Sequence, residues 1–298
     1  MRQFILGTDW WTDCDDAVAV RILARAHLAG QCRLLGVGMN ACMPYSAPSL
    51  RAFMDQEGLS GIPLAIDREA TDFGGKPAYQ ENFAKQYAPH LRNTDFPDSL
   101  SLYRKLLADA ESPVEILEIG YPQVLSALLQ SGPDEFSPKT GLELISQKVT
   151  KLWIMAGKWD GDGEKENNFC RNPRSRVAGE ILCRLWPTPI TFLGWEVGYG
   201  ILTGGELSKD DPLRQIMADH GSAVGRHSWD PMLVLLALTG NEADAGYDIR
   251  KGWATLDADT GANHFTPDPH GPHQYVIKRE PDGYYRDAIN RLIDSNRR

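Results

Sequence analysis

The chain has 298 residues, of which 42% are hydrophobic and 24% are charged, and its formal net charge is −9. These values are typical of a globular protein with a large buried core. The acidic balance and the lack of a basic stripe argue against nucleic acid as the main partner. No apolar run is long enough to cross a bilayer, so we expect no membrane partner. We also expect no secretory leader, because an apolar run begins almost at once.

Short apolar runs alternate with longer amphipathic stretches along the chain. The expected strands are 4–6, 33–38, 63–66, 114–119, 151–155 and 189–193, and the expected helices are 17–29, 47–56, 123–130, 175–185 and 231–238. This alternation predicts an α/β fold with an open, mostly parallel central sheet flanked by helices and a Rossmann-like core. Residues 70–112 are polar and less regular, and we interpret them as a partly helical excursion, either a substrate flap or surface structure. No linker interrupts the chain, so we expect a single domain, 1–298.

The five cysteines are an odd number and include no Cys-x-x-Cys pair. We therefore expect reduced, mostly buried thiols and a cytoplasmic location. Cys14 lies among acidic residues, which predicts a raised thiol pKa and a poor nucleophile.

The first acidic segment follows the first expected strand and contains Asp9, Asp13, Asp15 and Asp16. Four carboxylates within eight residues repel one another unless a cation neutralises them. Their all-oxygen character favours calcium or magnesium over zinc. Helix capping alone would explain Asp15 or Asp16, but not Asp9, which comes well before the helix. We therefore predict a cation site here.

Two later segments carry polar residues next to expected strands or helices. Asp230 has the character of an N-cap with Pro231 at the first helical position, which alone indicates only a well-capped helix. If Asp230 lies at the same sheet edge as the first acidic segment, it would supply another carboxylate to the predicted cation site. Glu166, Asn168 and Asn40 suit hydroxyl recognition, although a plain surface loop is the alternative. There is no phosphate-binding loop and no dinucleotide fingerprint.

In this order, the motifs resemble the inosine–uridine-preferring nucleoside hydrolase family. The resemblance rests on an Asp after the first strand, Asp-Asp-Ala at 15–17, Asn40, Glu-x-Asn-Phe at 166–169 and Trp-Asp-Pro at 229–231, with support from 246–248 and 259–265. It implies hydrolysis of a ribonucleoside to ribose and free base by a Ca²⁺-bound water, in nucleoside salvage. It also implies a homodimer or homotetramer.

The resemblance further implies roles for individual residues. Asp9 would be a calcium ligand and the general base. Further calcium ligands would be Asp16, Asp230 and the backbone carbonyl of Gln123, where the family usually has Thr. The substrate contacts would be Asp15, Asn40, Glu166, Asn168, Trp229 and His227. Metal-held water on one face of the sugar predicts inverting displacement.

The chain departs from the family at several positions. Trp229 stands where known members carry His, and His227 lies further upstream, so the base preference is open. Trp229 either stacks on the base or packs in the core. Trp10 and Trp11 either narrow the pocket or pack beneath it. Asp13 is extra, and is either a supporting acid or a surface one.

Two other functions compete with nucleoside hydrolysis. A magnesium-dependent haloacid-dehalogenase-type phosphatase also begins with a strand and an Asp, but it needs a second Asp where Trp11 stands. A non-catalytic, calcium-dependent nucleoside or ribose binder is the other alternative. Such a binder would have no need for a general base at Asp9.

Overall fold

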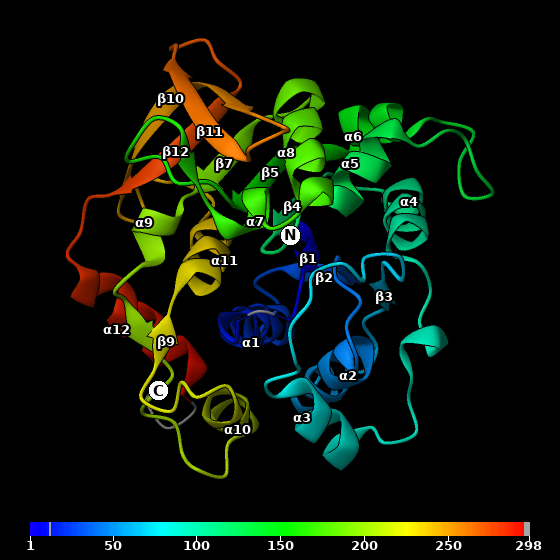
Figure 1. Ribbon diagram of the computed structural model, residues 1–298, viewed down its shortest axis with the longest axis vertical. Helices are drawn as coiled ribbons and strands as arrows, with labels where there is room; N and C mark the ends of the chain where they lie inside the picture. The colour runs from blue at the N-terminus through cyan, green and yellow to red at the C-terminus, as the bar shows by residue number, and fades with distance from the viewer. Residues whose placement is uncertain (12, 295–298) are drawn as a thin grey trace.

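The computed structural model describes residues 1–11 and 13–294, and within them ten strands form one sheet. In spatial order they are β3 (Leu64–Ile66), β2 (Arg33–Met39), β1 (Gln3–Thr8), β4 (Val114–Glu118), β5 (Val149–Met155), β7 (Ile190–Leu193), β12 (His273–Lys278), β10 (Tyr247–Leu256), β11 (Ala262–Pro267) and β6 (Glu164–Lys165). All pairings from β3 to β12 are parallel, and those beyond β12 are antiparallel. Figure 1 shows β3 at one end and β10–β12 at the other. The predicted α/β fold with a mostly parallel sheet is confirmed.

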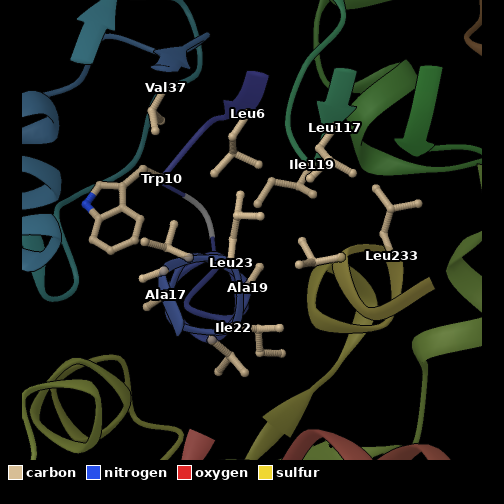
Figure 2. Packing of buried hydrophobic residues seen from close by; sticks show 14 of the residues in the cluster. Leu6, Trp10, Ala17, Ala19, Ile22, Leu23, Val37, Leu117, Ile119 and Leu233 are labelled. Atoms are coloured by element: carbon tan, nitrogen blue, oxygen red, sulfur yellow. The ribbon is translucent and has the colours of Figure 1, made fainter. Parts of the chain in front are cut away.

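Helices cover both faces of the parallel strands, which is why these strands are apolar runs rather than alternating ones. In β1, Phe4 and Leu6 belong to one buried cluster and Ile5 to another. The first cluster includes side chains of α1 (Asp15–Leu28), α2 (Ser46–Gln56), α10 (Pro212–Asp219), α11 (Trp229–Thr239) and α12 (Asp282–Ile293). The second includes α4 (Ser99–Asp109), α5 (Gln123–Gln130), α6 (Gly141–Lys148) and α8 (Pro173–Leu185). Figure 2 shows Leu23 of α1 and Leu233 of α11 packed beneath Leu6 and Leu117.

The start of α11 differs from the prediction. The N-cap is Ser228, and Asp230 is the second residue of the helix, so its predicted N-cap role is wrong. The Ser228 hydroxyl bonds the Ile201 carbonyl oxygen at 2.8 Å instead of capping the helix. Pro231 still lies in the first turn, where its missing N–H leaves no hydrogen bond unmade. The shift places the Asp230 carboxylate inside the first turn of α11.

The irregular segment 70–112 contains α3 (Gln80–Tyr87), a 3-10 turn (Asn93–Asp95) and α4, so the expectation of a partly helical excursion is confirmed. Short elements complete the fold: α7 (Asn167–Cys170), α9 (Trp195–Gly198), and a two-stranded sheet of β8 (Leu202–Thr203) and β9 (Arg226–His227). All five cysteines are free, and three of them are buried. Across residues 1–11 and 13–294, we find no helix with the length and apolar character that a membrane crossing requires.

Candidate functional site

An acidic cavity of about 280 Å³ opens at the carboxyl edge of the parallel strands. It lies where β1, β4, β5 and β7 end and where α1 and α11 begin. Its lining consists of Asp9, Asp13, Asp15, Asp16, Ile119, Met155, Glu166, Asn167, Asn168, Trp195, Arg226, Trp229 and Asp230. Ligands of open α/β sheets bind at this edge, so the fold places the cavity where a site is expected.

Three carboxylates converge at the first turns of two adjacent helices. One oxygen each from Asp15, Asp16 and Asp230 lies within 4.8 Å of the others, and all three residues are buried. The backbone N–H of Asp230 donates to Asp15 Oδ2 at 3.1 Å, which joins the start of α11 to the start of α1. Figure 1 shows these helices, blue and yellow, side by side.

The ionised forms of these three carboxylates are unfavourable unless a positive charge lies close to them. Burial raises the pKa of Asp15, Asp16 and Asp230 well above the usual range, and repulsion from neighbouring carboxylates raises it further. A divalent cation would favour the ionised forms instead. The donor set is entirely oxygen, so the residues present fit a hard cation such as calcium or magnesium.

Asp9 lies at the end of β1 and lines the same cavity, outside the three-carboxylate group. Burial raises its pKa to about 7, and repulsion from Asp13 and Glu118 adds to the effect. The Trp11 N–H donates to Asp9 Oδ1 at 3.3 Å, and the Tyr121 side chain also hydrogen-bonds the carboxylate. Asp9 is thus held in place by these two hydrogen bonds, and a cation bound beside it would favour its ionised form.

The two tryptophans after Asp9 hold the acidic segment from beneath. Trp10 is fully buried, and its indole N–H donates to Ser49 Oγ at 2.9 Å. Its backbone adopts a left-handed φ of 48°, and its N–H donates to Asp16 Oδ1 at 3.2 Å. Trp11 donates from its indole to the Gly74 carbonyl oxygen at 2.8 Å. Neither residue is part of the cavity lining and both are buried, so they pack in the core rather than narrow the cavity.

Asp13 pairs with Arg226 across the cavity wall. The guanidinium binds the carboxylate in bidentate fashion, with Nε 2.7 Å from Oδ1 and Nη2 bonded to Oδ2. The Cys14 N–H also donates to Oδ1 at 2.7 Å. Asp13 is therefore a supporting acid, and its carboxylate pairs with the Arg226 guanidinium. The adjacent acids and, above all, burial raise the pKa of the Cys14 thiol, as predicted.

Glu166 and Asn168 both line the cavity, and backbone contacts fix their positions. Glu166 caps α7, its Oε1 accepting the Asn168 N–H at 2.8 Å and its Oε2 accepting the Gly157 N–H at 3.0 Å. Burial raises the pKa of Glu166 to about 7. Asn168 donates from Nδ2 to the Met155 carbonyl oxygen at 2.9 Å. Both side chains are thus held rigidly beside the acids.

Asn40 and Gln123, by contrast, are not among the residues that line the cavity. Asn40 Nδ2 donates to Glu118 Oε1 at 2.7 Å, and its Oδ1 accepts the Tyr121 N–H at 2.9 Å. Gln123 is the first residue of α5, and its Nε2 donates to the Asn40 carbonyl oxygen. Asn40 therefore lies behind the cavity wall and holds the turn between β4 and α5.

The aromatic residues near α11 divide between the cavity and the surface. Trp229 lines the cavity beside Trp195, donating from Nε1 to the Trp195 carbonyl oxygen at 2.7 Å. Their rings are stacked with centroids 6.3 Å apart. His227 is not part of the lining: its Nδ1 accepts the Gly200 N–H at 2.9 Å and its ring stacks on Tyr199. Burial lowers the pKa of His227.

Several lining residues were not predicted. Ile119, Met155 and Trp195 stand at or just after the ends of β4, β5 and β7, so the sheet-edge rule could have identified them. Arg226 precedes the Trp-Asp-Pro motif, but nothing in the sequence pairs it with Asp13.

No protein-family model matches the sequence, and no curated protein matches it. Solved structures do match the fold over nearly the whole chain. The plant nucleoside hydrolase PpNRh1 has a TM-score of 0.74 at 14% identity, with 99% of each chain covered. An inosine–uridine preferring nucleoside hydrolase from Bacillus anthracis has a TM-score of 0.69 at 16% identity, with 98% of this chain and 99% of that one covered. The type III effector protein XopQ, complexed with adenosine diphosphate ribose, has a TM-score of 0.68 at 15% identity, with 98% and 92% covered.

Proposed function

We propose that this chain, which has the fold of the nucleoside hydrolases, hydrolyses the N-glycosidic bond of a ribonucleoside to ribose and a free base. The observation that carries the proposal is the convergence of Asp15, Asp16 and Asp230 beside Asp9 in one cavity. These acids come from distant parts of the chain, so their meeting is a product of the fold and not of local sequence.

Calcium is the cofactor we propose for the acid cluster. Asp16 and Asp230 would hold it together with Asp9, and the position of Asp15 in the three-carboxylate group makes Asp15 a further candidate ligand. The resemblance also implies the Gln123 carbonyl as a ligand, although Gln123 is not among the residues that line the cavity. When bound, calcium would supply positive charge that orients the ribose hydroxyls and acidifies a water.

Asp9 would act as the base that takes a proton from the attacking water. Burial raises the pKa of Asp9 to about 7 in the metal-free chain, and bound calcium would lower it again, so that Asp9 would be ionised and able to accept the proton. The surrounding carboxylates stabilise the positive charge that develops on the sugar as the C1′–N bond breaks. Attack on the face opposite the base gives direct, inverting displacement.

The remaining lining residues would place the substrate. Glu166 accepts and Asn168 donates hydrogen bonds, so the pair can recognise sugar hydroxyls, which act as both donors and acceptors. Such contacts, away from the reacting bond, use binding energy to orient it. Trp229, stacked near Trp195, offers a face on which a planar base can lie.

A panel of nucleosides, assayed by reducing-sugar release with added calcium, tests the proposal. We expect the wild type to release ribose, and Asp9→Asn to retain the fold by circular dichroism but lose turnover by roughly 10³-fold or more. Near-normal activity in Asp9→Asn would refute the base assignment. Saturable nucleoside binding without product from the wild type would instead support the non-catalytic binder.

A further inference from the structure

Arg226 is the feature of the cavity that the proposed roles do not use. Among the described residues that line the cavity, it alone carries a positive charge, against six carboxylates. Its guanidinium carbon lies 5.4 Å from the centre of the Trp229 ring. The cation therefore stands at the end of the cavity where the base would stack.

The Asp13 carboxylate fixes the orientation of this guanidinium. Its Nε and Nη2 are both bonded to Asp13, a bidentate geometry that sets the plane of the group. Asp13 is itself held, because its carbonyl oxygen accepts the Tyr79 hydroxyl at 3.0 Å and its Oδ1 accepts the Cys14 N–H. The plane of the Arg226 guanidinium is thus fixed before any ligand enters the cavity.

The third nitrogen of the guanidinium, Nη1, has no hydrogen-bond partner among the described residues. Nη1 lies on the side of the guanidinium away from the carboxylate, and within residues 1–11 and 13–294 it makes no hydrogen bond. The Arg226 side chain lines the cavity and is 30% exposed. A donor in this position suits a base that presents an acceptor, such as a carbonyl oxygen or an unprotonated ring nitrogen.

We propose that Arg226 donates from Nη1 to the departing base and stabilises the negative charge that forms on it. This inference rests on the proposed function. As water attacks C1′ and gives its proton to Asp9, the electron pair of the C1′–N bond moves onto the base. Arg226 stays charged and cannot supply a proton, so the base leaves as a hydrogen-bonded anion and is then protonated from solvent. Arg226 would thereby assist the departure of the base by its charge and not by proton transfer.

The alternative is that Arg226 only ties the acidic segment to β9 and so positions the carboxylates. The two roles differ in their dependence on the leaving group. A residue that stabilises the leaving group matters most when the departing anion is poor. A residue that positions the acids matters equally for every substrate, because the acids act on the sugar.

The experiment compares Arg226→Gln and Arg226→Lys with the wild type on inosine and on p-nitrophenyl β-D-ribofuranoside. The p-nitrophenolate ion departs without assistance. For Arg226→Gln we expect kcat/KM to fall by roughly 10²-fold on inosine and by less than about 3-fold on the nitrophenyl substrate. Arg226→Lys keeps the charge without the planar guanidinium, so it should lose less on inosine.

Equal losses on both substrates, or no loss on either, would overturn the inference and leave Arg226 a positioning residue. Calcium affinity, measured by titration calorimetry, should match the wild type in both variants, and a large drop would also favour the positioning role. If the wild type hydrolyses neither substrate, the proposed function fails and the inference fails with it. If the wild type hydrolyses both substrates, the inference can fail alone.

Discussion

When a chelator has removed divalent cations, the free energy of unfolding of this protein should fall as the pH rises. Asp9 has a pKa of about 7 in the folded chain against an ordinary 3.8. Between these pH values the folded chain holds a proton that the unfolded chain has released. Stability therefore decreases from pH 3.8 to about 7 and stays low above that. Asp15, Asp16 and Asp230 shift in the same direction and add to the effect.

The size of the effect follows from the pKa of Asp9. A rise from 3.8 to about 7 corresponds to about 4 kcal/mol, because each tenfold change in proton affinity is worth about 1.4 kcal/mol. In a chain of this size about 1 kcal/mol moves Tm by roughly 2 °C, so Asp9 alone accounts for roughly 8 °C. Calcium that binds only the folded state should reverse the loss.

Thermal melts of the chelated protein at several pH values from 4 to 8, with and without calcium, measure this directly. Asp9→Asn removes one titrating group and should flatten the curve of the chelated protein. Asp109→Asn alters a carboxylate that lies at the surface in a pair with Lys105, and should leave the curve unchanged. A chelated protein whose Tm is constant or rises between pH 5 and 8 would refute the reasoning.

Two further substitutions probe the cavity. Trp229→Ala should change kcat/KM among nucleosides by roughly 10-fold or more relative to one another, while calcium content, measured by atomic absorption, stays the same; equal losses for all bases would contradict a role in base recognition. Gly120→Ala should destabilise the fold by about 1–3 kcal/mol and lower activity, because the new Cβ would lie 2.4 Å from the Asp9 backbone nitrogen and 2.5 Å from Asn40 Oδ1. Denaturant unfolding checks the second prediction, and wild-type stability in that variant would show that the turn can shift.

The sequence predicted the central strands well because these strands are buried on both faces. Such strands read as short apolar runs, as at 4–6 and 151–155. The strand β10 was missed for the opposite reason. It alternates between exposed and buried residues and exposes Asp248–Lys251, so it contains no apolar run.

The acids of the site could be predicted because they are clustered in sequence at a helix start. The direction of a side chain after a strand depends on the turn that follows, which explains why Asn40, directly after β2, faces Glu118. His227 lies within β9, and its contact with the Gly200 N–H depends on the pairing of β9 with β8. The pairing of Arg226 with Asp13 spans 213 residues, and no local pattern encodes a contact of that range.

The hydrogen bond from the Asp230 N–H to Asp15 joins residues 215 positions apart. During synthesis the N-terminal acids leave the ribosome long before α11 exists, and domains of this size generally fold as units. A nascent or truncated chain that stops before α11 would therefore lack the Asp230 carboxylate, one of the three in the proposed cation site. The chain would then bind calcium tightly only after α11 has folded onto α1. A fragment that ends near residue 220 should bind calcium no better than an unstructured acidic peptide.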